Sequence, residues 1–269
     1  MIGTLKRWVR DGMGAIAPET FTALQSARAR GHSHRLVREW GLLDLNRKLI
    51  DRYGPTVQAG PFAGMTLTPM TRREHLGPFL LGTYEAELHT WLERIAARPF
   101  SHILDVGAKF GYYAVGLARR MPATPVIAFD TDWWARAATE EMALANRVPH
   151  AVPSGYCSPR WLDRHLLPNA FVFSDCEGYE GELFGRSKTT ALSTATLLIE
   201  IHDELVSGVG ARIRARFAET HSVEAAVAVP REPISALSEF LNTDEAATAI
   251  REYRGPQEWL LLTPRGEQP

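Results

Sequence analysis

Two acids and two glycines at the ends of two apolar segments are the residues of this chain best placed to do chemistry. The otherwise apolar segment 103–106 contains Asp105. Gly107 and Gly111 follow this segment, and Asp130 comes directly after the next apolar segment. This order predicts a strand, a glycine turn, a helix and a second strand. The pattern is typical of a turn that holds a nucleotide-like ligand at the N-terminus of a helix.

The acids decide which nucleotide-like ligand fits. The dinucleotide fingerprint has a middle glycine that lets the backbone approach a pyrophosphate, and Lys109 stands at that position here. Asp105 would repel a pyrophosphate but attract an ammonium group. Asp130 lies nineteen residues past Gly111, about where an acid hydrogen-bonds the ribose hydroxyls. A ribose, an amino-acid tail and no phosphate describe S-adenosylmethionine. The alternative is a glycine turn that only lets the helix pack closely.

A second polar group follows two later strands. Asp175 comes after the apolar residues 171–174, and Glu200 and His202 lie at the end of the apolar segment that begins at Thr196. Carboxyl ends of parallel strands meet at one edge of a sheet, where ligands bind. Methyl transfer to a hydroxyl needs orientation and a base, which Asp175, Glu200 or His202 could supply.

Two alternatives remain for these three residues. Asp175 could cap the following helix while Glu200 holds loop backbone. A divalent metal on Asp175, Glu200 and His202 is chemically plausible. No strong ligand spacing supports a metal, so none is predicted.

Strand-like and helix-like segments alternate from residue 103 onward. This alternation predicts an α/β fold with a Rossmann-like, doubly wound sheet that is mostly parallel. The last two strands lack βαβ spacing, which predicts an antiparallel strand at the edge. The predicted strands are residues 103–106, 126–129, 150–154, 171–174, 196–201, 222–229 and 258–263, and the predicted helices are 82–97, 112–121, 132–146, 159–165, 180–184 and 209–220, with a short hairpin at 62–67.

The chain divides into an N-terminal helical extension, residues 1–54, and a methyltransferase-like domain, residues 55–269, with a helical insertion at about 230–256. The extension carries ten Lys/Arg against five Asp/Glu. It is interpreted as a solvated helical extension that packs on the domain or on another subunit, which would form a homo-oligomer. A docking arm for an anionic partner is the alternative.

Bulk properties restrict the partners and the compartment. The 269 residues carry a net charge of −1, so no overall field favours nucleic acid or an anionic membrane. The chain has only two cysteines, and they lack metal-ligand spacing. So few cysteines favour a reducing compartment. No apolar run reaches the roughly 18 residues of a membrane span. The expected protein is cytoplasmic and bacterial.

Together these motifs resemble the FkbM-type branch of S-adenosylmethionine-dependent methyltransferases, over roughly residues 80–205. The resemblance implies a strand order of 3-2-1-4-5-7-6 and O-methylation of a sugar, glycan or other small-molecule hydroxyl. The matching segments are Gly82-Thr83-Tyr84-Glu85, Asp105-Val106-Gly107-Ala108 with Gly111, Ala128-Phe129-Asp130, Asp175-Cys176-Glu177-Gly178-Tyr179-Glu180 and Leu198-Ile199-Glu200.

The resemblance also implies a set of cofactor contacts. By position, Asp105, Gly107 and Gly111 would cradle the methionine part and Asp130 the ribose. Glu85 and His89 lie four residues apart on the predicted helix. The two side chains either reach the cofactor or substrate or form only an exposed pair with each other. The cofactor-binding residues expected in all are Tyr84, Glu85, Asp105, Gly107, Ala108, Gly111, Asp130, Thr131 and Asp175.

Two other functions stay open at this point. The first is a methyltransferase that acts on nitrogen or on a macromolecule, although the Asn/Asp-Pro-Pro-Tyr/Phe tetrad of N-methyltransferases is absent after the fourth strand. The second is a non-catalytic protein that keeps the fold for interaction. Lys109-Phe110, which departs from the family pattern, is the feature that favours the second.

Overall fold

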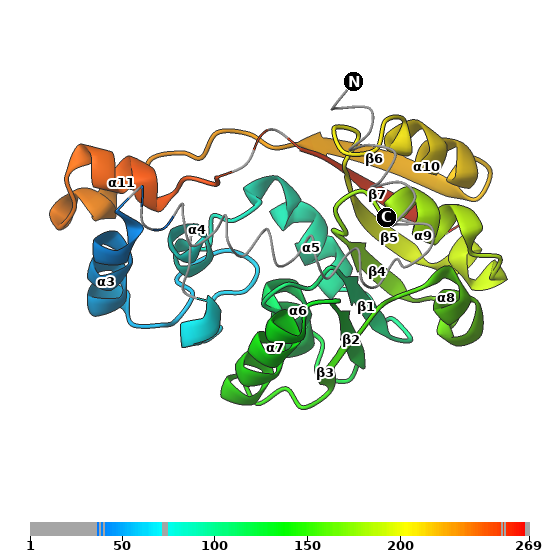
Figure 1. Ribbon diagram of the computed structural model, residues 1–269, viewed down its shortest axis with the longest axis horizontal. Coiled ribbons are helices and arrows are strands. Elements are labelled where there is room, and N and C mark those ends of the chain that lie inside the picture. The colour runs from blue at the N-terminus through cyan, green and yellow to red at the C-terminus, as the bar shows by residue number, and fades with distance from the viewer. Residues whose placement is uncertain are drawn as a thin grey trace, which may run out of the picture.

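The computed structural model describes residues 37, 39, 41–71, 75–253, 255 and 257–266. Seven strands in these residues form one sheet of order β3-β2-β1-β4-β5-β7-β6 (Figure 1). Strand β7 runs antiparallel to both β5 and β6, and the other pairs are parallel. This confirms the predicted fold class and strand order. The strands are β1 (Ile103–Val106), β2 (Val126–Phe129), β3 (Ala151–Ser154), β4 (Phe171–Ser174), β5 (Thr196–Ile201), β6 (His221–Val227) and β7 (Glu258–Pro264).

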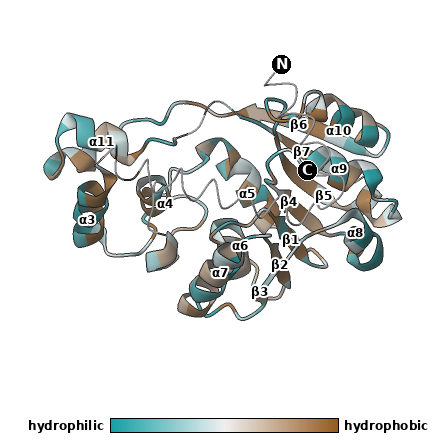
Figure 2. Ribbon diagram, viewed as in Figure 1, coloured by the Kyte–Doolittle hydropathy of each residue, from teal (hydrophilic) through white to brown (hydrophobic). Residues whose placement is uncertain are grey.

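The central strands are apolar on both faces because helices cover both sides of the sheet. All residues of β1, β4 and β5 are buried, as expected for parallel strands in an α/β fold. Edge strand β6 instead exposes several of its residues. In Figure 2 the central strands are drawn mostly in brown, the colour of hydrophobic residues.

Three helices pack on each face of the sheet. Strand side chains alternate between faces, so Ile103 belongs to one buried cluster and Leu104 to the other. Asp105 therefore shares the face of Ile103, toward the first group of helices. The first group is α5 (His89–Ala96), α6 (Tyr112–Arg120) and α7 (Trp133–Ala145), and the second is α8 (Pro159–His165), α9 (Glu180–Arg186) and α10 (Val209–Phe217).

A smaller lobe combines α3, α4 and the helical part of the insertion (left of Figure 1). The insertion leaves the sheet after β6 and returns as β7. A Cβ added at Gly77 of α4 would lie 2.0 Å from the carbonyl oxygen of Ala249 in α11, so glycine lets these helices touch. The lobe contains α3 (Leu42–Tyr53), α4 (Leu76–Leu81), η4 (Ser235–Glu239) and α11 (Thr243–Ala249); the other short helices are η1 (Pro69–Thr71), η2 (Ala86–Leu88) and η3 (Thr190–Thr194).

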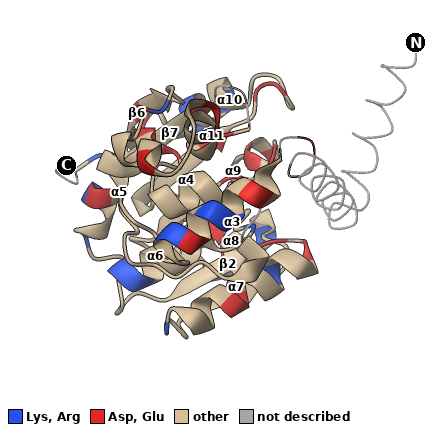
Figure 3. Ribbon diagram, turned by 90° about the vertical axis from the view of Figure 1, so that its left-hand side faces the viewer, with Lys and Arg blue, Asp and Glu red and all other residues tan. Residues whose placement is uncertain are grey.

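Two ion pairs join α3 to the insertion in this lobe, which faces the viewer in Figure 3. Lys48 lies 2.6 Å from Glu245, and Arg52 lies 2.9 Å from Glu239. Basic residues of α3 thus pair with acids that are far away in the sequence. Residues 1–36, 38 and 40 of the predicted extension lie outside the described residues. The predicted packing of that part on the domain or on another subunit therefore stays a prediction.

Two local predictions were wrong. The helix expected from residue 82 begins only at His89, after the 3-10 turn η2, because Gly82 and Glu85 adopt left-handed conformations (φ 71° and 48°). The amide of Glu85 donates to Glu252 (3.0 Å) rather than into a helix. The hairpin expected at residues 62–67 is reduced to one antiparallel bridge between Thr56 and Thr66.

The remaining predicted strands and helices agree with the observed ones apart from small shifts at their ends. The insertion is helical in part, with η4 and α11. None of the helices in the described ranges has the length and apolar character needed to span a bilayer.

Candidate active site

Four acidic side chains lie at the carboxyl ends of neighbouring parallel strands. In the sheet register, Asp105 of β1 lies opposite Ala128 of β2 and Phe173 of β4. Asp130, Asp175 and Glu200 lie at the same ends of β2, β4 and β5. The structure therefore brings together the two polar groups that the sequence placed 45 and more residues apart.

The glycine turn after β1 packs directly against the loop after β4. Gly107 has φ 91°, and a Cβ there would lie 1.6 Å from the carbonyl oxygen of Asp175, so only glycine fits. The amides of Gly107 and Ala108 both donate to the carbonyl oxygen of Phe129 (2.9 Å each). Gly111 is the N-cap of α6. These amides tie the turn to β2, so side chains and the remaining backbone atoms must make any ligand contact.

Asp105 is a buried carboxyl group without a side-chain hydrogen-bond partner. Its exposure is 1%, and apart from a weak contact with the Ala114 amide neither carboxyl oxygen has a partner among the described residues. Burial raises the pKa of Asp105 to about 8, the charges of Asp175 and Asp130 raise it further, and the amide of Ala114 offsets part of the effect. Because an unsatisfied buried carboxyl group costs free energy, this side chain is suited to a ligand that brings positive charge and hydrogen-bond donors.

Asp130 is held by two backbone amides. Its Oδ2 accepts from the amide of Lys109 (2.9 Å) and its Oδ1 from the amide of Asp132 (2.8 Å). Lys109 adopts φ 49°, an uncommon conformation for a non-glycine residue that points this amide at Asp130. Burial raises the pKa of Asp130 to about 7, although the Lys109 amide and the charge of Arg136 counteract it. A carboxylate oxygen can accept two hydrogen bonds, so each oxygen retains acceptor capacity.

The residues next to the glycine turn and to Asp130 include a buried aromatic ring, that of Phe110. Phe110 is buried, and its ring lies 6.0 Å from that of Trp134 in edge-to-face geometry. The Lys109 ammonium group lies over the Phe110 ring. Thr131 is half-buried after Asp130. Phe110 thus packs toward α7, where it helps to fix the turn.

Tyr84 and Glu85 lie in a buried aromatic cluster. The Tyr84 ring packs against Phe79 and Tyr112. Glu85 has 1% exposure and accepts a hydrogen bond from the Tyr113 hydroxyl. Glu85 is therefore not part of an exposed pair with His89, and its charge contributes to the raised pKa of Asp105.

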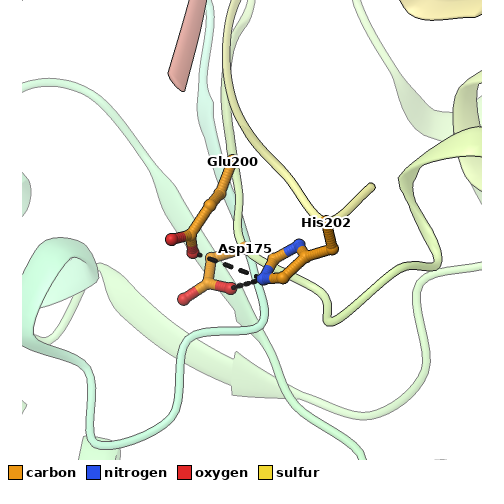
Figure 4. A group of neighbouring side chains, drawn as sticks. All are labelled: Asp175, Glu200 and His202. Carbon is orange, nitrogen blue, oxygen red and sulfur yellow. Dashed lines mark ion pairs between the residues drawn. The ribbon is translucent and has the colours of Figure 1, made fainter. Parts of the chain in front are cut away.

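Asp175, Glu200 and His202 form a cluster at the ends of β4 and β5 (Figure 4). His202 Nε2 lies 3.5 Å from Asp175 Oδ1 and 3.6 Å from Glu200 Oε2. The side chains of Glu200 and His202 are 2% exposed, whereas that of Asp175 is 29% exposed. Glu177 Oε2, on a largely exposed side chain, lies 3.9 Å from the same nitrogen. Asp175 is thus the one of the three that an external molecule can reach most easily.

Glu180 is a functional candidate that the sequence analysis quoted but gave no role. Its Oε1 lies 2.7 Å from His202 Nδ1 and also accepts the amides of Cys176 and Gly178 (3.2 and 3.3 Å). The side chain is fully buried. A second acid at the start of α9, three residues after Glu177, was the signal that could have identified it.

The charge of His202 reflects these neighbours. Burial alone would lower its pKa, but the hydrogen bond that His202 donates to Glu180 and the charges of Asp175 and Glu177 outweigh burial and raise the pKa of His202 to about 9. Without a ligand, this cluster therefore relies on an imidazolium to balance several carboxylates.

A buried ion-pair group joins the insertion to the turn before α5. Arg231 Nη2 lies 2.7 Å from Glu87 Oε2 and 2.6 Å from Glu252 Oε1, with all three side chains at most 8% exposed. Arg231 and Glu252 belong to the outgoing and returning arms of the insertion. No sequence motif predicted this group, because its members are far apart in the chain.

The two arms also enclose a mostly apolar cavity of about 800 Å³. Val229, Ile234 and Ile250 line it, with Arg231 and Glu252 on its wall. None of the site residues expected from the sequence lines this cavity. It is a separate feature of the insertion.

No protein-family model matches this chain, and no curated protein matches it. Several solved methyltransferases are similar in structure. A putative O-methyltransferase from Klebsiella pneumoniae shares 15% identity over 87% of this chain and 96% of its own, with a TM-score of 0.42. The O-methyltransferase TomG from Streptomyces achromogenes, in complex with SAM, shares 16% identity over 64% and 77% (TM-score 0.43).

An rRNA methylase from Streptococcus thermophilus is similar to the same degree, with 13% identity over 65% of this chain and 95% of its own and a TM-score of 0.43. The named proteins thus differ in what they methylate. With TM-scores below 0.5, these similarities say nothing about the acceptor of this chain, and the expectation that nucleic acid is not a partner stays a prediction.

Proposed function

We propose that this chain is an S-adenosylmethionine-dependent methyltransferase of the FkbM type that methylates a hydroxyl of a sugar, glycan or other small molecule. The observation that carries the proposal is the buried carboxyl group of Asp105, which has no side-chain hydrogen-bond partner, beside the amide-held carboxyl group of Asp130. An ammonium group is the ligand part that would best satisfy the first, and a ribose diol the second. When bound, S-adenosylmethionine supplies the methyl group that is transferred.

The glycine turn and the two acids divide the binding role. Asp105 would pair with the ammonium group, because a charged donor stabilises the ionised form of a buried carboxyl group. Asp130 would accept the ribose hydroxyls on its remaining lone pairs. Gly107 keeps the turn against the loop of Asp175, so the cofactor tail and the acidic cluster are held at one edge of the sheet.

The cluster of Asp175, Glu200 and His202 would act on the acceptor. A hydroxyl must lose its proton as the methyl group arrives, and an oriented base speeds this step. Asp175 is the most accessible of the three, so its carboxylate is assigned the contact with the acceptor hydroxyl. His202, which is buried and whose Nε2 lies 3.5 Å from Asp175 Oδ1, would orient that carboxylate through its charge.

The experiment is a methyl-transfer assay with labelled S-adenosylmethionine and a matched panel of acceptors. The panel pairs each sugar or small-molecule alcohol with the corresponding amine and adds RNA. Label on an alcohol, with less than about a tenth as much on the amine, supports the proposal. Label on amines or RNA alone would replace O-methylation by another acceptor class. Cofactor binding without transfer to any acceptor would favour an interaction protein.

A further inference from the structure

The two ring nitrogens of His202 have different surroundings. Nδ1 lies 2.7 Å from Glu180 Oε1, a normal hydrogen-bond length. Nε2 makes no hydrogen bond to any described residue, and its nearest carboxylate oxygens lie 3.5 and 3.6 Å away. These distances exceed the roughly 2.7–3.2 Å of a nitrogen–oxygen hydrogen bond. One side of the ring is therefore fixed, and the other is directed between two carboxylates to which it does not bond.

Burial makes this arrangement costly without a ligand. The imidazole of His202 is 2% exposed, and Asp175 Oδ1 is a buried atom with no hydrogen-bond partner among the described residues. Buried polar atoms are normally paired. Two polar atoms that face each other at 3.5 Å without a hydrogen bond, one just after each of two adjacent strands, indicate that a third species fits between them.

The spacing agrees with a metal ion. Metal–ligand bonds of about 2.1 Å place neighbouring ligand atoms about 3.0–3.4 Å apart in octahedral or tetrahedral geometry. The distances from His202 Nε2 to Asp175 and Glu200 are only slightly longer. One ligand atom from each of the three residues lies within 4.8 Å of the others. The two distances from His202 would thus need to shorten by only a few tenths of an ångström to fit an ion.

We propose that Asp175, Glu200 and His202 bind a divalent cation, with Glu180 as the residue that positions the histidine. Metal-binding histidines commonly donate their other N–H to a carboxylate, which fixes the tautomer. Because imidazole is a better ligand for first-row transition metals than for Mg²⁺ or Ca²⁺, the site favours Mn²⁺, Co²⁺ or Zn²⁺. Three protein ligands leave positions open for water or for substrate oxygen.

The catalytic consequence rests on the proposed function. A cation beside Asp175 lies where the acceptor hydroxyl must approach, and a cation lowers the pKa of a hydroxyl that it contacts. The cluster would then assist proton loss more strongly than a carboxylate alone.

The test is titration of Mn²⁺ alone into chelator-treated full-length protein, without cofactor or acceptor. Calorimetry gives stoichiometry and affinity, and the electron paramagnetic resonance signal of free Mn²⁺ confirms them. We expect one ion per chain. Asp175→Asn, Glu200→Gln and His202→Asn should each weaken binding by about tenfold or more, and Glu180→Gln by about tenfold. Mg²⁺ should bind more weakly than Mn²⁺.

Glu177→Gln is the matched control, since it removes an acid 3.9 Å from the same nitrogen whose side chain is 72% exposed. It should change the affinity by roughly threefold or less. Removing Glu200 from a buried position risks the fold, so Asp175→Asn, checked by melting temperature, is the deciding variant. An absence of Mn²⁺ binding at millimolar concentration would overturn the proposal, as would equal losses in Glu177→Gln and Asp175→Asn.

Failure of this proposal is distinguishable from failure of the proposed function. Mn²⁺ binding is read without S-adenosylmethionine, and methyl transfer can be assayed in chelator. Full activity in chelator, with no bound Mn²⁺, would leave the methyltransferase and remove the metal site.

Discussion

The two acidic regions at the carboxyl edge of the sheet differ in how their charge is balanced. At β1 and β2, Asp105 and Asp130 have no side-chain hydrogen-bond partner, and burial raises the pKa of both. At β4 and β5, the acids surround a histidine whose pKa they raise. In the proposed function a ligand brings positive charge to Asp105 in the first region, whereas the second region contains a histidine that would act as a cation or as a metal ligand.

This difference is the basis of the proposed roles. In the proposed site, the ammonium group of the cofactor would supply the positive charge beside Asp105. A site that acts on a neutral hydroxyl needs charge held in place before the acceptor arrives, because preorganised groups avoid reorganisation during the reaction. The comparison therefore separates binding residues from reacting residues, and mutations in the two regions should have different signatures.

The largest expected effect is on turnover in the β4–β5 region. Asp175→Asn and Glu200→Gln preserve shape but remove charge, so turnover should fall by about 10²–10⁴-fold with cofactor binding nearly intact. Turnover, cofactor affinity and melting temperature are measured on the same samples. Glu182→Gln, an exposed acid on α9 paired with Arg186, should retain activity. Full activity of both site variants would remove the cluster from the chemistry.

The next effect separates the two ends of the cofactor. Asp105→Asn should weaken the binding of S-adenosylhomocysteine by on the order of tenfold or more, because a charge-assisted hydrogen bond to the ammonium group is lost. The affinity for adenosine, which has no ammonium group, should fall much less. Competition binding of the two ligands gives the ratio. Equal losses for both would show that Asp105 supports the turn rather than the ammonium group.

A similar or smaller loss is expected at β2. Asp130→Ala removes an acceptor of ribose hydroxyls, which costs about 1.5–3 kcal/mol or roughly tenfold or more in dissociation constant. Here the affinities for adenosine and for S-adenosylhomocysteine should fall by similar factors, since both ligands contain the ribose. Unchanged affinity would remove Asp130 from the site.

The smallest effect is on stability, and its size depends on pH. The folded protein holds a proton on Asp105 up to about pH 8, whereas the ordinary pKa is 3.8. Between these values the unfolded state binds fewer protons, so this group lowers stability as pH rises. Without ligand, Asp105→Asn should therefore raise the melting temperature more at pH 8 than at pH 5.

Asp163→Asn is the control of opposite sign. Hydrogen bonds from Ser187 and from the amides of Lys188 and Thr189 lower the pKa of Asp163. Its contribution is present above its unfolded pKa and lost as pH falls, so the amide should lower the melting temperature at pH 8. A parallel response of the two variants would contradict the assignment for Asp105.

The local sequence was enough to predict the sheet, because each strand is a short apolar segment that ends at a polar residue. It also located Asp105, Asp130, Asp175, Glu200 and His202, since strand ends converge in a parallel sheet. It failed where distant residues decide the conformation. The hydrogen bond from the Glu85 amide to Glu252 depends on the returning insertion, and so does the burial of Arg231 between Glu87 and Glu252.

Binding of S-adenosylhomocysteine to the full chain tests the central claim most directly. Calorimetry should show one site per chain, and the site should weaken in both Asp105→Asn and Asp130→Ala while surviving Asp175→Asn. No binding at millimolar ligand by a folded protein, or binding that ignores both β1 and β2 acids, would contradict the account.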